Sequence, residues 1–293
     1  MHFVRAKGLL SQGNGINIYR GCTHGCIYCD SRSTCYHIDH NFEDIEVKQN
    51  APELLRDALS RRRKRCMIAT GAMCDPYMHC EESLGLTRQC LDIIEEFGFG
   101  VAVQTKSDRI LRDFDRLCRI HQKSKAVVQM TLTTFDKQLC RILEPDVCGT
   151  ERRAEVLRKF SDAGIPTVAW ITPILPFLND TEENLRGVLE LCFHAGVCGI
   201  VWFGAGVTLR EGDREYCYAA FDRHFPGLKA VYQKKFGNAY ECMSDNNARL
   251  SRIFHEECER RGVMHDNGQI FDFMHRFPEE PVMEQIGLFD GLT

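Results

Sequence analysis

Short apolar runs rich in β-branched residues alternate along the chain with longer segments whose apolar positions recur every three or four residues. The segment 83–97, for example, carries Leu86, Cys90, Ile93 and Phe97 on one helical face. Strands that alternate with helices of this length are typical of βα units arranged around a parallel sheet. The pattern therefore predicts an α/β fold.

Six strands are predicted, at 16–19, 66–70, 101–105, 126–133, 166–172 and 199–203. The helices between them are predicted at 52–63, 83–97, 110–121, 152–163 and 182–195. Pro52 suits a first helical turn, and Gly164 is placed to end the fourth of these helices. Six such repeats predict an open partial TIM barrel, (βα)6, and not the closed eight-stranded form.

From about residue 206 the chain becomes more polar, and helices are predicted at 210–225, 228–236 and 245–261. Such helices would cover the open side of the barrel, protecting its edge and excluding water from its interior. We therefore expect a barrel with its cysteine loop over 1–205, a helical C-terminal extension over 206–275, and a flexible tail over 276–293.

Composition narrows the class of protein. The 293 residues, 44% of them hydrophobic, suffice for one large domain. No apolar run is long enough to span a membrane, and residues 1–7 lack the apolar stretch of a secretory signal, so a cytoplasmic location without membrane contact is expected. The 16 cysteines are then expected as thiols. A net charge of −4 argues against non-specific coating of nucleic acid, and 61–65 is the one dense basic run.

Three cysteines, Cys22, Cys26 and Cys29, stand close together with gaps of three and two residues. Such a run can bind a [4Fe-4S] cluster while leaving one iron without a protein ligand. The alternative is a structural zinc site, which would need a fourth ligand such as His24 or Cys35 and normally uses two CxxC knuckles. Because the sequence has no second knuckle, the spacing favours the cluster.

Other polar segments follow the predicted strands directly. They are 70–77 after the second strand, 105–108 after the third, and 131–134 with Glu144 and Pro145 after the fourth. In a parallel barrel the carboxyl ends of the strands meet at one face, which is where the active site lies. The cysteine run follows the first strand, so all these segments are expected around one site.

Together these segments resemble the spore photoproduct lyase-like family of the radical SAM superfamily over most of residues 14–205. Asn17-Ile18-Tyr19-Arg20 precedes the first cysteine, Arg32 follows the last, and DPY, TKS and EP elements recur in order. The resemblance implies that the open iron chelates S-adenosylmethionine (SAM). Reductive cleavage of SAM would then give a 5′-deoxyadenosyl radical that abstracts hydrogen from a substrate.

The resemblance also implies roles at single positions. Gly71 and Ala72 lie where the main chain approaches the methionyl amino group of SAM, and small residues allow that approach. Lys106, with Ser107 beside it, is placed to bind the SAM carboxylate. Thr131 and Thr133 occupy alternate positions of one strand, and one or both could contact the ribose or carboxylate. Alternatively, Lys106 is a surface lysine and the threonines simply favour a strand.

A hydrogen donor for the product radical is less clearly marked. In the lyases of this family a cysteine after the second strand returns hydrogen, but alignment on Asp75 places Ala72 at that position. Cys74 is the candidate here because a thiol S–H bond is weak, and the alternative is a buried structural thiol. Tyr28 and Tyr77 could relay hydrogen or stack on a substrate, or belong to the core.

The predicted reaction is hydrogen abstraction from a DNA lesion or modified base. Radical modification of RNA, a peptide or a small metabolite stays open, as does a non-catalytic metal-binding scaffold, because fold and cofactor do not fix a substrate. An electron donor such as flavodoxin or ferredoxin is implied. The segment from Gln285 to Phe289 resembles the peptide that binds the bacterial sliding clamp, or else folds back onto the barrel.

Overall fold

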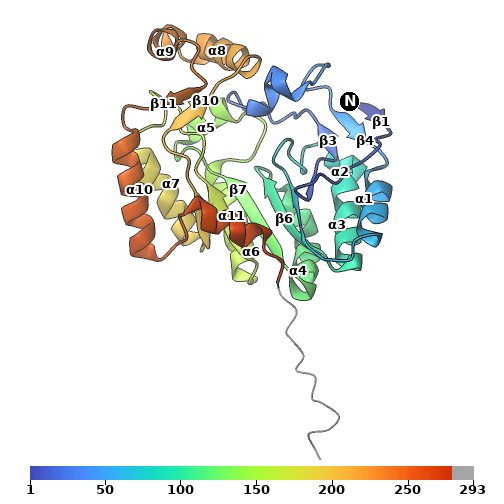
Figure 1. The fold of residues 1–293 in the computed structure, drawn as a ribbon. Coiled ribbons are helices and arrows are strands. Elements are labelled where there is room, and N and C mark those ends of the chain that lie inside the picture. The colour runs from blue at the N-terminus through green and yellow to red at the C-terminus, as the bar shows by residue number, and fades with distance from the viewer. Residues whose placement is uncertain (279–293) are drawn as a thin grey trace, which may run out of the picture.

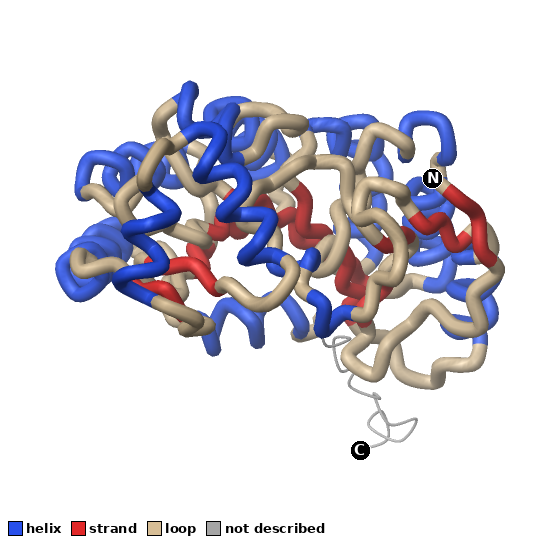
Figure 2. The backbone as a smooth tube through the Cα atoms, turned by 90° about the horizontal axis from the view of Figure 1, so that it is seen from above, coloured by secondary structure: helices blue, strands red, loops and turns tan. Residues whose placement is uncertain are grey.

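The computed structural model describes residues 1–278. Within them, six parallel strands form one sheet in the order β2-β5-β6-β7-β8-β9, and the connecting helices lie outside it (Figure 1). Seen from above, the strands form a curved row that does not close on itself (Figure 2). This confirms the open partial barrel. The strands are β2 (Gly15–Ile16), β5 (Met67–Thr70), β6 (Gly100–Thr105), β7 (Ala126–Thr131), β8 (Thr167–Trp170) and β9 (Gly199–Val201).

The helices on the outer face follow the predicted pattern. They are α1 (Ala51–Ser60), α3 (Leu86–Phe97), α4 (Phe114–Lys123), α6 (Thr150–Asp162) and α7 (Glu182–His194). Their buried residues, such as Leu117 and Leu157, pack in one core with outward strand residues such as Val101, Val103 and Val128. Burial of this shared apolar surface is the main force that holds helices and sheet together.

Two predicted helices are interrupted. The helix expected at 83–97 is divided into α2 (Glu81–Leu84) and α3, because Gly85 between them has a φ of +60°. The helix expected at 110–121 starts as a 3-10 helix, η3 (Asp108–Asp113), before α4 begins. Apolar spacing alone does not distinguish these turns from a continuous α-helix.

The strand expected at 16–19 is also divided, because the chain passes from one sheet to another. Its second half, β3 (Tyr19–Arg20), joins β1 (His2–Val4) and β4 (Glu46–Lys48) in a sheet of order β1-β4-β3. This small sheet, and the short helix α5 (Lys137–Leu143), were not predicted. Two or three residues are too few for a period-two pattern to be recognised.

The extension beyond β9 is not purely helical. It contains α8 (Asp213–His224), α9 (Leu228–Phe236) and α10 (Asn247–Arg261), close to the predicted ranges. It also contains an antiparallel strand pair, β10 (Gly206–Thr208) with β11 (Glu241–Met243), that was not predicted. The α8 and α9 helices lie at the top of Figure 1, whereas α10 packs beside α7.

A last helix, α11 (Asn267–His275), was also not predicted, and it packs against the inner side of the sheet. Its Ile270 and Met274 are buried in a cluster with the inward residues Met67, Ala102, Val127, Val168 and Val201. Just before it, Met264 pairs with Gly199 and covers the free edge of β9. The extension therefore completes the core of the barrel. The domain boundary expected at residue 205 is not tested by this packing and stays a prediction.

Residues 279–293 lie outside the described part, and they include the segment from Gln285 to Phe289. The flexible tail and the sliding-clamp partner therefore stay predictions. Within residues 1–278, the structure contains no helix long and apolar enough to cross a membrane.

One glycine controls how closely the loop after β5 approaches β6. Gly71 has a φ of +101°, and a Cβ atom built on it would lie 1.8 Å from the carbonyl oxygen of Gln104. A main-chain oxygen cannot move away as the end of a side chain can. Only glycine fits this position, so the predicted small residue is explained here by contact with the neighbouring strand.

We expect Gly71→Ala to lower the free energy of unfolding by at least about 3 kcal/mol, since it combines a strained φ with an overlap against main chain. Gly85→Ala is the matched control. Gly85 also has a positive φ but has no atom within 4 Å of its built Cβ, so it should lose only about 1–2 kcal/mol. Urea unfolding of both variants checks this, and equal losses would contradict it.

Candidate active site

A cavity of about 710 Å³ opens at the carboxyl ends of the strands. It is bounded by the cysteine loop, the loops after β5 and β6, the ends of β7 and β8, and the β10–β11 pair. Nine of the residues selected from the sequence line it: Cys22, Cys26, Tyr28, Cys29, Gly71, Ala72, Cys74, Lys106 and Thr131. The structure thus brings together segments that are far apart in the sequence.

Three of the selected residues, Ser107, Thr133 and Tyr77, do not line the cavity. Ser107 is buried, and its hydroxyl accepts a hydrogen bond from the Arg109 N–H at the start of η3. Thr133 lies two residues beyond the end of β7, so the strand alternation does not carry it to the side of Thr131. Its carbonyl oxygen instead accepts from the side-chain amides of Asn179 and Asn184.

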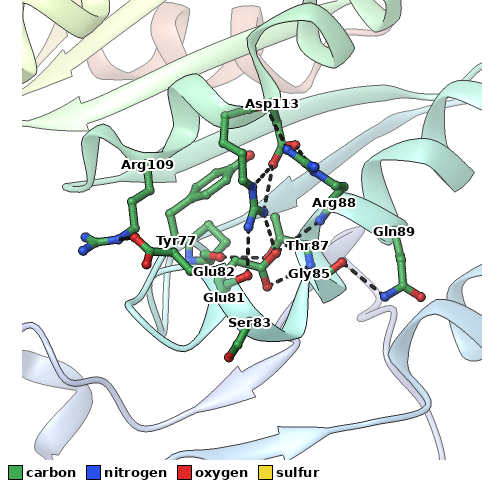
Figure 3. A network of polar contacts seen from close by, with 12 residues as sticks. Tyr77, Glu81, Glu82, Ser83, Gly85, Thr87, Arg88, Gln89, Arg109 and Asp113 are labelled. Carbon is green, nitrogen blue, oxygen red and sulfur yellow. Dashed lines mark hydrogen bonds and ion pairs between the residues drawn. The ribbon is translucent and has the colours of Figure 1, made fainter.

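Tyr77 does not line the cavity either. Its side chain is fully buried and points into a polar network beside Asp113 and Glu81 (Figure 3). Burial, followed by the charge of Asp113, raises the pKa of Tyr77 well above its usual value. In the same network, Arg88 and Arg112 form ion pairs with these two carboxylates. This position indicates a structural role.

The main chain fixes the cysteine loop at both ends. The Cys22 N–H donates to the carbonyl oxygen of Phe42 (3.0 Å), and the Ile27 N–H donates to that of Leu143 (3.0 Å). All three cysteines are free, with Cys22 and Cys26 buried and Cys29 half-buried. Burial raises the pKa of the first two, to about 12 for Cys26. A bound cation is therefore needed to hold them as thiolates.

The spacing of the three thiols does not suit a single ion. Within residues 1–278, one group of three metal-ligating side chains has all its donor atoms within 4.8 Å of one another, and it does not include these cysteines. Zinc–sulfur bonds of about 2.3 Å would bring the sulfurs closer than that. Cys35, one of the considered fourth ligands, is exposed and hydrogen-bonded to Arg210 (3.4 Å). The residues therefore fit a larger cluster better than zinc.

The carboxylate of Asp75 connects three of the segments around the cavity. It accepts hydrogen bonds from the Tyr77 N–H (2.8 Å), the Thr105 hydroxyl (2.7 Å) and the Lys106 N–H (2.7 Å). It also lies 3.4 Å from Nδ1 of His24, a buried residue of the cysteine loop. Burial alone would raise the pKa of Asp75, but His24 and these donors outweigh it and hold the pKa at about 2.

A second buried network lies beside Tyr28. Glu144 and Arg153 are both fully enclosed and form an ion pair of 2.6 Å, and the Tyr28 hydroxyl donates to Glu144. Although burial raises the pKa of Glu144, Arg153 and then Lys106 lower it below its usual value. Burial and the nearby carboxylate raise the pKa of Tyr28. Arg153 and Lys106 carry two positive charges beside the single negative charge of Glu144, which leaves positive charge for an anionic ligand.

Part of the cavity wall is aromatic, and this aromatic wall was not predicted from the sequence. Trp170 and Phe203 lie with ring centroids 6.1 Å apart, and the Trp170 indole N–H donates to Gln129. Phe203 and Tyr240 are 55% and 42% exposed, which is unusual for large aromatic side chains. Trp170 and Phe203 lie at or just after strands that were predicted. No local sequence pattern, however, indicated that the β10–β11 pair would lie beside them.

A partial parallel barrel with three cysteines, a lysine and a close-approach glycine around one cavity defines an enzyme that carries its cofactors at the carboxyl face of the strands. The sequence profile of the Radical SAM superfamily matches residues 16–192, and the chain belongs to this superfamily. Its cofactors are therefore a [4Fe-4S] cluster and SAM.

Two relatives come from distant organisms. An uncharacterized protein of Mycobacterium tuberculosis is 28% identical over 227 residues, which are 75% of this chain and 66% of that protein. An uncharacterized protein of Methanocaldococcus jannaschii is 31% identical over 169 residues, which are 57% of this chain and 62% of that protein. The matches thus leave about a third of each relative uncovered.

Solved structures of spore photoproduct lyase have a similar fold. The complex with dinucleoside spore photoproduct has a TM-score of 0.64 and 15% identity, and the alignment covers 90% of this chain and 80% of that one. A mutant with bound AdoMet and the same dinucleoside has a TM-score of 0.60 and 16% identity, with coverages of 85% and 74%. At such low identity the likeness establishes the fold alone.

We expect Asp75→Asn to lower the free energy of unfolding by about 2 kcal/mol at pH 7, because the pKa of Asp75 falls from 3.8 to about 2 on folding. A carboxyl group whose pKa is lower in the folded than in the unfolded state stabilises the fold at pH values above its unfolded pKa. For Asp75 this stabilisation is lost as the pH falls from about 4 to about 2. The difference between wild type and variant should therefore be about half as large at pH 3. Urea unfolding at several pH values measures it, and a constant difference would contradict the expectation.

We expect Glu144→Gln to lower the free energy of unfolding by about 3–5 kcal/mol, because it leaves the buried Arg153 without its counter-charge. Glu151→Gln is the control, since Glu151 pairs with Lys137 on the surface, and such pairs contribute about 1 kcal/mol or less. Chemical denaturation of both variants gives the comparison. Similar losses would show that the enclosed pair is no more important than the exposed one.

Proposed function

We propose that the chain is a radical SAM enzyme that abstracts hydrogen from a substrate with an aromatic ring, specifically a damaged or modified base in nucleic acid. One observation carries the proposal. The three cysteines and Lys106 open into the same cavity as the exposed rings of Phe203 and Tyr240. A cofactor held by the cysteines and a substrate stacked on these rings would thus share one cavity.

In this proposal Cys22, Cys26 and Cys29 hold the cluster. The main chain at Gly71 and Ala72 receives the amino group of SAM. The Lys106 ammonium lies 5.8 Å from the centroid of the Tyr28 ring, and it binds the SAM carboxylate by a charge-assisted hydrogen bond. Thr131 contributes its hydroxyl to the ribose or carboxylate. When bound, the reduced cluster and SAM together supply the radical that abstracts hydrogen.

We assign the return of hydrogen to Cys74. Cys74 lines the cavity, and its thiol donates to the Tyr19 carbonyl oxygen (2.9 Å); burial raises its pKa to about 12, so it keeps its hydrogen at neutral pH. Homolysis of the S–H bond passes one hydrogen atom to the product radical and leaves a thiyl radical. The thiol is restored when the thiyl radical takes one electron from the reductant and one proton from solvent. Tyr28, kept as a phenol, is the second candidate donor.

The aromatic wall supports the choice of substrate class. Every base has a flat face, and stacking on an aromatic side chain contributes about 1–3 kcal/mol per base. Arg210 donates to the Tyr240 hydroxyl (2.6 Å) and lies over its ring, while Asp30 balances the charge of Arg210 at 3.4 Å, so stacking and not charge supports this substrate class. Radical SAM enzymes generally need a reductant, and we propose flavodoxin or ferredoxin in that role.

The test begins with anaerobic reconstitution, reduction and addition of SAM. We expect 5′-deoxyadenosine from the wild type and none from the variant with Cys22, Cys26 and Cys29 changed to Ala. Lys106→Ala should raise the KM for SAM at least about 10-fold through the lost charged hydrogen bond. Lys137→Ala, an exposed lysine paired with Glu151, is the control. An intact cluster that never cleaves SAM would refute the enzymatic proposal.

The substrate class is tested separately with dinucleosides that carry base lesions. Phe203→Ala should raise the KM for them about 10-fold or more, since one stacking face is lost, while SAM cleavage without substrate stays unchanged. Phe135→Ala, another exposed phenylalanine that does not line the cavity, is the control. Equal KM values for the two variants would exclude a stacked base and favour a peptide or small metabolite.

A further inference from the structure

Three metal-ligating side chains meet on the small N-terminal sheet, away from the cavity. His2 lies on β1, and His40 and Asp44 lie in the loop that precedes β4. One donor atom from each lies within 4.8 Å of the other two. The His2 N–H donates to the Ile45 carbonyl oxygen (2.9 Å), which holds β1 against this loop. None of the three residues lines the cavity.

The tautomer of His40 is fixed by its surroundings. Its Nδ1 lies 2.9 Å from the carbonyl oxygen of Asn41, which can only accept, so Nδ1 carries the proton. The lone pair is then on Nε2, which is buried and has no hydrogen-bond partner. A buried acceptor without a partner is unfavourable. Metal-ligating histidines typically show this arrangement, with one nitrogen bound to a backbone carbonyl and the other directed at the metal.

The other two residues supply a second imidazole and a negative charge. Nδ1 of His2 and Oδ2 of Asp44 lie 2.9 Å apart and share a proton that a bound ion would replace, and the His2 and His40 rings meet edge to face with centroids 4.8 Å apart. The second carboxylate oxygen, Oδ1, pairs with the amino group of Met1 (2.7 Å). All three residues are half-exposed, so an ion can enter from solvent.

We propose that His2, His40 and Asp44 bind a divalent transition-metal ion, with zinc as the natural occupant. Two imidazoles and one carboxylate suit zinc and its neighbours, whereas magnesium and calcium prefer oxygen ligands throughout. Three protein ligands leave a fourth, tetrahedral position for water. This site is separate from the cysteine run and does not depend on the proposed reaction.

Such an ion would stabilise the segment to which the cysteine loop is hydrogen-bonded. The loop that holds His40 and Asp44 also holds Phe42, whose carbonyl oxygen accepts the Cys22 N–H (3.0 Å). It also holds Glu43, which forms an ion pair with Arg32 just after the last cysteine. The metal therefore ties β1 to the segment against which the first cysteine is fixed.

The test uses the untagged chain with Cys22, Cys26 and Cys29 changed to Ala, so that the cysteine run cannot take up the probe. We expect it to bind one equivalent of Co²⁺ with visible d–d bands and no sulfur-to-metal charge transfer, and Zn²⁺ to displace the Co²⁺. In this background His40→Ala should lower the affinity by more than about 100-fold, because loss of a ligand exceeds the 10–100-fold effect of losing a supporting partner. His194→Ala, a histidine exposed on α7, is the control and should bind as before.

Asp44→Asn is the second variant, since it keeps the shape of the carboxylate while removing its charge, and its affinity should also fall. Circular dichroism establishes that each variant is folded. Three results would each overturn the proposal: no Co²⁺ uptake by the parent chain, thiolate charge-transfer bands, or unchanged binding in both folded ligand variants.

Discussion

The arrangement of this site depends on one buried carboxylate. Asp75 receives main-chain and hydroxyl donors from the ends of β5 and β6 and faces His24 of the cysteine loop. Three segments that are distant in the sequence are thereby held at fixed positions relative to one another. Because this contact binds the main-chain amide of Lys106, it also fixes the point from which the Lys106 side chain reaches the cavity. A site fixed in this way is organised before any cofactor arrives, which lowers the cost of ordering it on binding.

The second enclosed network has a different task. Burying Glu144 with Arg153 brings little net stability, because the desolvation of two charges offsets most of their attraction. What the pair provides is orientation: Glu144 holds the Tyr28 hydroxyl, and Arg153 donates to the Thr131 carbonyl oxygen (2.8 Å). Both of these partners line the cavity. The network therefore fixes the orientation of these two groups by hydrogen bonds, which an apolar core could not do.

The barrel and the cysteine site were predictable because their signals are local. Six apolar runs with helical segments between them predict the βα repeats, and three cysteines within eight residues predict a cluster loop. The failures lie where tertiary structure decides. Strand β7 ends at Thr131, which excludes Thr133 from the cavity, and Tyr77 is enclosed in the core beside the polar network of Glu81. The aromatic wall needs the β10–β11 pair, whose three-residue strands carry no pattern that a sequence reveals.

Helix α11 has a consequence for the order in which the molecule can form. Its Ile270 and Met274 fill the inner side of a sheet whose first strand in that cluster begins at Met67. During synthesis on the ribosome, the six strands are complete some seventy residues before this helix emerges. Until then the nascent barrel exposes an apolar inner surface, and contacts of such long sequence separation form slowly. The growing chain is accordingly most vulnerable to aggregation in that interval, when chaperones have the most to protect.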